Sequence, residues 1–173
     1  IILVDNASKD ESHKECKNKF PKIKLIENKE NLGYCEGNNI GLRQVDGEYC
    51  IILNPDTEVE PNWINEFLKE YKNHGEGLYQ PKLLATNNKT RINSGGNMMN
   101  IFGFGYSLGK GKEDSEEFDK FKLINYASGA CLFTSKKILD KIGLFDPFLF
   151  AYHDDLELGW RAAELGIKSF YAP

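Results

Sequence analysis

The first half of the chain alternates short apolar runs with longer segments of helical period. Residues 1–4, 23–26 and 49–53 are short runs typical of buried strands. Among the segments that separate or follow them, residues 61–74 show one broad apolar face that includes Trp63 and Phe67. This alternation predicts βα units in an α/β fold, with a mostly parallel central sheet flanked by helices.

The pattern changes after residue 84. Residues 86–122 are rich in Gly, Asn, Lys and Asp and show no clean period, which predicts a long irregular excursion. Within it, the glycine-rich residues 95–111 are a candidate loop or lid on composition alone. Regular structure is expected to resume in a strand at 124–134, helices at 136–142 and 154–165, and a last strand at 167–171.

The totals describe an ordinary globular domain. The chain has 173 residues and a net charge of −4, which disfavours a nucleic-acid partner. Its four cysteines form no C-x-x-C pair, so neither a disulfide framework nor a zinc site is indicated. The chain begins inside a strand without Met and ends as another strand finishes. We therefore expect one domain over 1–173 that is cut from a longer protein at both ends.

Two carboxylates directly follow the apolar run at residues 49–53, in the segment Asn54-Pro55-Asp56-Thr57-Glu58. Pro55 cannot continue a central strand, so Asp56 and Glu58 fall at its carboxyl end, where ligands bind in open α/β sheets. Such a pair suits a divalent cation that carries phosphate oxygens. Taken alone, a simple helix cap explains Asp56 at least as well.

Two further segments carry candidate polar groups. Asn31-Leu32-Gly33 and Gly37-Asn38 lie on a loop and the start of a helix, where free N–H groups favour phosphate. Asp154, Asp155 and Glu157 crowd the first turn of another helix. Their mutual repulsion suits a general base, although acids at a helix start also complement its dipole. Arg161 follows Glu157 at i,i+4 spacing, which predicts an ion pair.

Together these segments resemble the family 2 glycosyltransferases, especially the rhamnosyltransferase-like branch. The matching pieces occur in the expected order and span essentially the whole chain. They are Val4-Asp5-Asn6-Ala7-Ser8, Asn31-Leu32-Gly33 with Gly37-Asn38-Asn39, Leu53-Asn54-Pro55-Asp56-Thr57, Ser128-Gly129-Ala130, and Gly143-Leu144-Phe145-Asp146 running on to Asp154-Asp155-Leu156-Glu157 and Trp160-Arg161. The resemblance implies a GT-A fold, a nucleotide-sugar donor, a divalent metal (Mg²⁺ or Mn²⁺) and inversion at the anomeric carbon.

The resemblance also implies roles for particular residues. The nucleotide-binding set comprises Asp5, Asn31, Gly33, Asn38, Asn54 and Asp56. Asp56 is the metal ligand of this set. Asp154 and Asp155 match the family's Glu-Asp pair, whose second acid is the catalytic base. The acceptor-side set comprises Gly129, Glu157, Trp160 and Arg161.

The implied reaction moves a sugar from a UDP- or dTDP-sugar to a saccharide or lipid-linked acceptor in cell-surface polysaccharide synthesis. Residues 1–84 would form the nucleotide-binding half and 85–173 the acceptor-side half. The expected location is the cytoplasm, with peripheral association at the inner face of the membrane.

This sequence departs from the family pattern at three positions. Asn54 replaces an Asp, Asp154 replaces a Glu, and Glu157 stands where Asp is typical. The Q-x-x-R-W signature of processive synthases is absent, which disfavours a polymerising enzyme. The competing interpretation is a non-catalytic domain that keeps the scaffold and binds a nucleotide weakly. A dinucleotide-binding oxidoreductase is disfavoured because no glycine fingerprint follows a strand.

Overall fold

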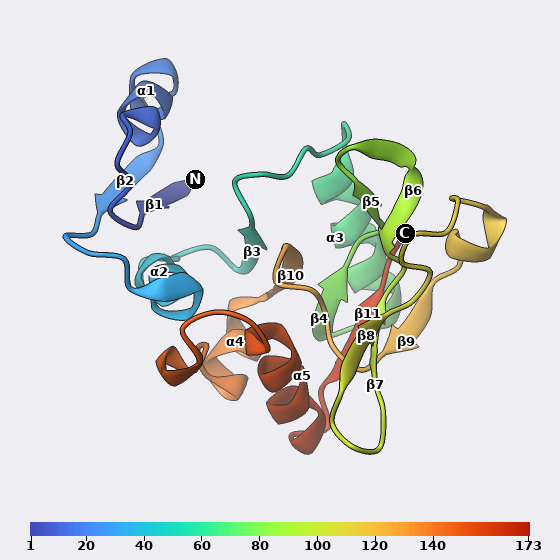
Figure 1. The fold of residues 1–173 in the computed structure, drawn as a ribbon. Helices are drawn as coiled ribbons and strands as arrows, with labels where there is room; N and C mark the ends of the chain where they lie inside the picture. Colours follow the sequence, from blue (N-terminus) through green and yellow to red (C-terminus); the bar gives the residue numbers. More distant parts are fainter. The chain divides into compact units, whose positions relative to one another are not determined.

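The computed structural model describes residues 1–173, which pack as two compact units. Unit 1 comprises Ile1–Gly47 and Leu144–Asp154, and unit 2 comprises Glu48–Gly143 and Asp155–Pro173 (Figure 1). These units are defined by packing. The functional halves expected from the sequence, 1–84 and 85–173, stay a prediction.

Unit 1 is built on a βαβ arrangement. Strand β1 (Ile2–Asp5) pairs in parallel with β2 (Lys24–Glu27), and α1 (Ser12–Lys19) connects them. Helix α2 (Gly33–Leu42) contacts both β1 and the short 3₁₀ helix η2 (Pro147–Leu149). The parallel pair brings the turn after β1 and the loop before α2 to the same edge, because parallel strands end on the same side.

Unit 2 contains a sheet of five strands. Their spatial order is β3 (Tyr49–Leu53), β10 (Cys131–Ser135), β4 (Gly77–Gln80), β11 (Lys168–Tyr171) and β9 (Lys122–Ile124). The only parallel pair of neighbouring strands is β4 with β11, while β10 is antiparallel to both of its neighbours and β9 is antiparallel to β11. The expected mostly parallel sheet is therefore wrong, and the sheet is mixed. The reason is that β10 and β9 return from the long excursion and enter the sheet in the opposite direction.

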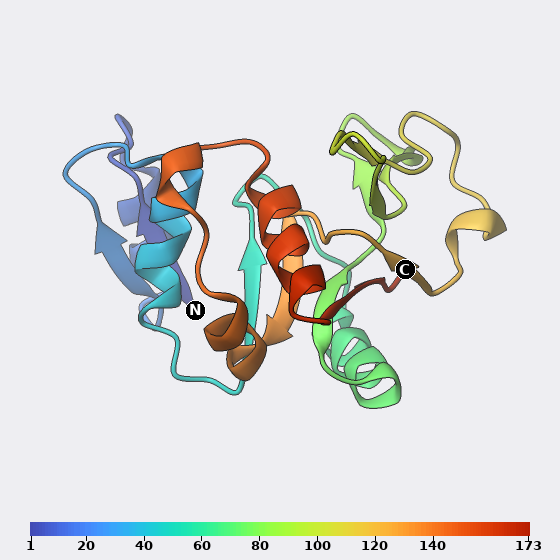
Figure 2. The ribbon, with the colours of Figure 1, turned by 90° about the horizontal axis from the view of Figure 1, so that it is seen from below.

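The helices of unit 2 begin and end at residues with clear local roles. In α4 (Lys136–Ile142) the Ser135 side chain accepts a hydrogen bond from the Ile138 N–H at 3.2 Å, a helix N-cap. Gly143 ends this helix with a φ of 92°, which favours glycine. Helix α3 (Trp63–His74) lies alongside β4 in both views (Figures 1 and 2). No helix has both the length and the apolar character that crossing a membrane requires.

Regular structure also occupies part of the segment expected to be irregular. Two antiparallel hairpins and a 3₁₀ helix lie within or at the edge of this segment, and a strand of the main sheet begins at its end. The hairpin elements are β5 (Leu83–Ala85) with β6 (Asn88–Ser94) and β7 (Asn97–Met99) with β8 (Gly105–Ser107), and the 3₁₀ helix is η1 (Glu116–Phe118). The expected strand at 124–134 is likewise interrupted, because residues 125–130 form a turn between β9 and β10. Backbone pairing stabilises these short polar strands, which carry little hydrophobic period.

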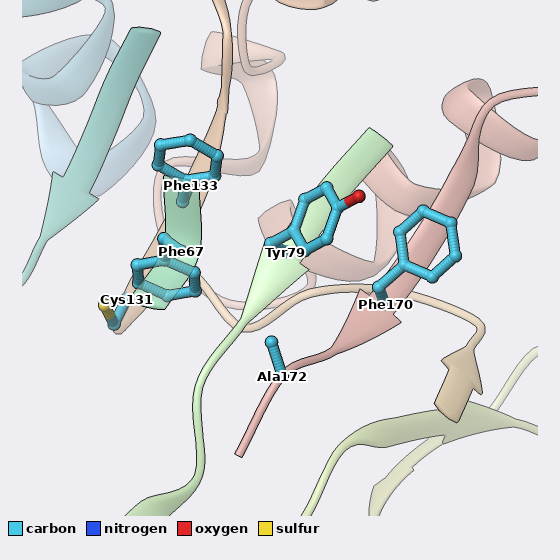
Figure 3. Packing of buried hydrophobic residues seen from close by; sticks show 6 residues of the cluster. All are labelled: Phe67, Tyr79, Cys131, Phe133, Phe170 and Ala172. Atoms are coloured by element: carbon cyan, nitrogen blue, oxygen red, sulfur yellow. The ribbon is translucent and has the colours of Figure 1, made fainter. Parts of the chain in front are cut away.

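An aromatic core lies between α3 and the sheet of unit 2. Figure 3 shows its members, which come from α3, β4, β10, β11 and the residue after β11: Phe67, Tyr79, Cys131, Phe133, Phe170 and Ala172. The rings of Phe67 and Phe133 stack with centroids 5.1 Å apart, and Tyr79 and Phe170 approach to 4.9 Å. Such pairs add to the gain from burial, so this cluster holds α3 on the sheet.

A buried polar network joins the sheet to the hairpins. The Gln80 side chain, which is fully buried, accepts hydrogen bonds from the Ser128 N–H and the Asn97 Nδ2, both at 2.9 Å. Its own Nε2 donates to Ser94 Oγ at 2.8 Å, and Ser94 Oγ donates to Asn97 Oδ1 at 2.9 Å. Since every member has a partner, the network fixes the end of β4 against the turn at 125–130.

Replacing Phe133 by alanine tests the aromatic core. Because Phe133 is almost fully buried and stacked, Phe133→Ala should lower the free energy of unfolding by about 3–5 kcal/mol in urea denaturation. Phe102→Ala is the matched control, since Phe102 is exposed, and it should change stability by no more than about 0.5 kcal/mol. Equal losses in the two variants would contradict this description of the core.

Replacing Gln80 by leucine tests the polar network. Gln80→Leu leaves the Ser128 N–H and the Asn97 amide without their partner, at a cost of about 1–3 kcal/mol for each buried group. The exposed Gln44, which accepts a hydrogen bond from Lys24, supplies the control Gln44→Leu, with little expected loss. Urea unfolding measures the free energy of unfolding of both variants. If Gln80→Leu loses as little stability as Gln44→Leu, the polar network does not stabilise the fold.

Candidate functional site

The carboxyl end of β1 holds a buried acid in unit 1. The Asp5 carboxylate accepts hydrogen bonds from the Ser8 N–H, with both oxygens at 3.3 Å. His13 Nδ1, on the buried side of α1, lies 3.6 Å from Asp5, and its Nε2 lies 3.3 Å from Glu27. The sequence gave no functional role to His13, which the structure places against Asp5. Its place on the inward face of a short helix was the available signal.

Asn6 organises the loop that precedes α2, and the sequence interpretation gave it no role. Its Nδ2 donates to Asn31 Oδ1 at 3.0 Å and to the Gly33 carbonyl at 2.8 Å. Its Oδ1 accepts from Asn28 Nδ2 and from the Leu32 N–H, both at 3.1 Å. Because Asn6 directly follows Asp5, the structure brings the predicted residues Asn31 and Gly33 to the end of β1.

Gly33 occupies a position that only glycine fits. Its φ is 79°, and an added Cβ would lie 2.5 Å from the Phe150 carbonyl oxygen. The Cys35 N–H donates to that same carbonyl at 3.1 Å, so Phe150 satisfies a backbone N–H in the first turn of α2. Asn38 lies further along α2, where its Nδ2 donates to the Tyr34 carbonyl at 2.9 Å. The nucleotide-binding roles of Gly33 and Asn38 stay a prediction.

In unit 2, the turn after β3 presents one unpaired carboxylate. The Asn54 N–H donates to the Ala130 carbonyl at 3.0 Å, and the Asn54 carbonyl accepts from Thr57 Oγ1 at 2.7 Å. These bonds close the turn around Pro55, and the exposed Asp56 side chain makes no hydrogen bond or ion pair. Glu58, the second candidate for a cation, is instead paired with Lys89 of β6, which lowers the pKa of Glu58.

A groove of about 620 Å³ adjoins Asp56 within unit 2. The turn after β3, α3 and the β5–β6 hairpin form its walls. Acidic side chains line it together with Trp63, Lys82 and Asn93. Its size falls in the range of small-molecule sites, so Asp56 stands at the edge of a space that can admit a ligand.

The candidate base Asp155 is tied to the same region of unit 2. Asp155 Oδ2 accepts a hydrogen bond from the Gly129 N–H at 3.2 Å, and Oδ1 accepts from the Leu156 N–H at 2.8 Å. Burial and the Asp155 charge raise the pKa of Tyr126 to about 12. Ala130, next to Gly129, binds the Asn54 N–H. The turn at 128–130 therefore holds the Asp155 carboxylate on one side and the Asn54–Asp56 turn on the other.

The remaining residues of α5 (Asp154–Glu164) are mostly engaged in structural contacts. Asp154 is buried at the first position of the helix. Arg161 pairs with Glu157, as the i,i+4 spacing predicts, through an Nη2–Oε2 contact of 2.7 Å. Its Nη1 also donates to the Ile142 carbonyl at 2.7 Å, which joins α5 to α4. Trp160 is half exposed and donates to Glu164 at 3.0 Å. Acceptor-side roles for Gly129, Glu157, Trp160 and Arg161 stay a prediction.

The donor groups at Asp56 fit a metal that is completed by a ligand, and not a metal held by protein alone. No group of three or more His, Cys, Asp or Glu side chains is arranged to hold an ion. Mg²⁺ is commonly held by one or two carboxylates together with substrate phosphates. The exposed and unpaired Asp56 can supply one such carboxylate, whereas Glu58 is occupied by Lys89.

Comparison with curated proteins shows relatives that transfer sugars. The chain is 27% identical over 176 residues to the low-salt glycan biosynthesis hexosyltransferase Agl10 of Haloferax volcanii, covering 97% of this chain and 54% of that protein. It is 22% identical over 197 residues to the N-acetylglucosaminyl-diphospho-decaprenol L-rhamnosyltransferase of Mycobacterium tuberculosis, covering 100% and 64%. The chain thus spans between half and two thirds of the length of these relatives.

Solved structures share the fold at low sequence identity. GalNAc-T7 with UDP, GalNAc and Mn²⁺ matches with a TM-score of 0.78 at 17% identity, over 100% of this chain and 36% of that one. The mannosyltransferase PcManGT of Pyrobaculum calidifontis, with GDP-Man and Mn²⁺, matches with a TM-score of 0.66 at 16% identity, over 99% and 44%. These matches confirm the expected α/β GT-A fold.

The family model described as glycosyl transferase family 2 matches residues 1–143, which is most of the chain. The matched region contains the β1 end, the Asn31–Gly33 loop, the Asn54–Asp56 turn and the 128–130 turn. The chain belongs to glycosyl transferase family 2.

Proposed function

We propose that the full-length protein is an inverting glycosyltransferase that uses a nucleotide-diphosphate sugar. The observation that carries this proposal is the turn at 128–130, which binds Asp155 through Gly129 and the Asn54–Asp56 turn through Ala130. A displacement at an anomeric carbon needs a carboxylate that accepts a proton and a place for a diphosphate leaving group. Unit 2 supplies candidates for both, Asp155 and Asp56, on two segments that are hydrogen-bonded to the same turn.

Asp155 acts as the general base in this proposal. The acceptor hydroxyl gives its proton to the carboxylate while its oxygen bonds to the anomeric carbon. The bond between that carbon and the diphosphate oxygen breaks, and the electron pair leaves with the nucleotide diphosphate. The N–H groups of Gly129 and Leu156 orient the carboxylate, so that its position does not depend on solvent.

Asp56 is the residue that would hold Mg²⁺ or Mn²⁺. When bound, the metal neutralises charge on the diphosphate. No group of three or more His, Cys, Asp or Glu side chains is arranged to hold an ion, so the proposed metal is one that Asp56 shares with the donor diphosphate. In unit 1, Asp5 and the Asn6-centred loop with Asn31 and Gly33 are proposed to bind the nucleotide, since their donors and acceptors gather at the carboxyl end of β1.

The relatives support a narrower class of substrates. One is a hexosyltransferase of glycan biosynthesis, and another is a rhamnosyltransferase whose name specifies a decaprenol-linked diphosphate acceptor. We therefore propose a UDP- or dTDP-sugar donor and a saccharide or lipid-linked saccharide acceptor in cell-surface polysaccharide synthesis. The proposed location is the cytoplasm, at the inner face of the membrane.

Donor binding by Asp56 variants tests this proposal. The full-length protein should gain thermal stability with one member of a panel of UDP-, dTDP- and GDP-sugars in the presence of Mn²⁺. A donor at 100 times its Kd stabilises by about 2.7 kcal/mol. Asp56→Asn should remove the Mn²⁺-dependent part of this gain, because the unpaired carboxylate is lost.

Glu58→Gln is the matched control. Glu58 is a nearby acid whose carboxylate is paired with Lys89, so its variant should keep the wild-type response. Equal responses of wild type and Asp56→Asn would contradict the metal role of Asp56. No response of the wild-type protein to any donor would refute the transferase and favour the non-catalytic interpretation.

A further inference from the structure

The tip of the β7–β8 hairpin in unit 2 exposes a cluster of apolar side chains. Ile101 is 94% exposed, Phe102 78%, Phe104 70% and Tyr106 50%. In Figure 1 the loop between β7 and β8 extends beyond the neighbouring strands. Single exposed apolar residues are common, but four within six successive residues mark an interaction surface.

This tip is an ordered turn that presents its side chains outward. The Asn100 side chain accepts hydrogen bonds from the Phe102 N–H at 2.9 Å and from the Phe104 N–H at 3.1 Å. The Gly103 N–H donates to the Asn100 carbonyl at 3.0 Å, and its φ of 85° favours glycine. Because the backbone is satisfied within the loop, the aromatic side chains are free to contact a partner.

The charge pattern along the hairpin identifies the chemistry of that partner. No charged residue occurs from Ile92 to Gly109, whereas Arg91, Lys110 and Lys112 flank this stretch and are exposed. Arg91 lies opposite Glu113, and the acids Asp114 and Asp119 further along the chain pair with Lys82. Of the charged residues that follow the hairpin, Lys110 and Lys112 come first and lie nearest to it in sequence, before the acids at 113–119. An apolar, aromatic tip with cations at its base matches a lipid surface, where acyl chains meet phosphate head groups.

The hairpin also lies next to the candidate base. A Cβ on Gly105 would come within 2.5 Å of Tyr126 Oη and 2.7 Å of Leu156 Cδ1, so β8 packs closely on these side chains. Leu156 directly follows Asp155 and donates its N–H to that carboxylate. Because β8 packs on the residue next to Asp155, a membrane that contacts the hairpin tip would also lie close to Asp155.

We propose that the β7–β8 hairpin docks on a membrane surface by inserting Ile101, Phe102 and Phe104 at the lipid interface. The tip is convex and its side chains stand free, which suits a fluid lipid surface better than a preformed protein pocket. The proposal rests on the proposed function in one respect, that a lipid-linked acceptor would be presented to Asp155 from that membrane. Docking itself requires neither donor nor catalysis.

Vesicle flotation of the full-length protein tests the docking surface. The probe is vesicles of phosphatidylcholine and phosphatidylglycerol, prepared with and without a polyprenyl phosphate. The protein should float with both, and the double variant Phe102→Ser/Phe104→Ser should lower the partition coefficient at least about tenfold, because two aromatic side chains no longer enter the interface. Phe20→Ser, a change at a half-exposed Phe of unit 1, should bind as wild type does.

Each outcome decides the proposal. Wild-type binding by the double variant, or a loss of the same size in Phe20→Ser, overturns the role of the hairpin. Binding that requires the polyprenyl phosphate overturns the bilayer surface in favour of the carrier chain itself, and no vesicle binding at all favours a protein partner. Since flotation uses no donor, a failure here is distinct from failure of donor-induced stabilisation, which would refute the proposed function.

Discussion

The buried carboxamide of Gln80 is the contact on which the functional edge of unit 2 depends. It joins the end of β4 to the Ser128 N–H and to Asn97, which begins the β7–β8 hairpin. The turn at 128–130 that it anchors then binds Asp155 and the Asn54 turn. A polar group so deeply buried is tolerated because each of its atoms has a partner. One side chain thus links the central sheet, the candidate base, the candidate metal ligand and the proposed membrane-docking hairpin.

The sequence predicted those parts of the fold that depend on local hydrophobic period. The helix around Trp63 and Phe67 and the short helix closed by Gly143 lie close to where their patterns place them. The direction of β10 could not be predicted in this way, because strand direction is set by pairing with residues distant in the sequence. The same holds for the hairpins within 86–122, whose polar strands are stabilised by backbone bonds and by the Gln80 network.

The candidate site shows a similar division. Asp56 and Asp155 were proposed from their order and resemblance, and the structure adds the bonds of Gly129 and Ala130 that relate them. Asn6 and His13 were missed because their importance lies in contacts across the chain, to Asn31 and to Asp5. In the sequence, Glu58 and Asp56 were equivalent candidates for a cation. In the structure, Glu58 forms an ion pair with Lys89 of the neighbouring hairpin, and Asp56 does not. Local motifs therefore indicated the chemistry, and tertiary contacts decided which residues are available for it.

In the proposed mechanism, Asp155, held by the 128–130 turn, removes the acceptor proton. The most direct test is the turnover number of full-length Asp155→Asn with its donor and acceptor, since the amide can keep the Gly129 contact but accepts no proton. If Asp155 is the general base, the turnover number should fall by about 10²–10⁴-fold while the affinity for the donor stays unchanged. Asp140→Asn, a change at an exposed acid paired with Lys136, should leave turnover as in the wild type. A turnover number of Asp155→Asn within a few-fold of the wild-type value would show that Asp155 is not the general base.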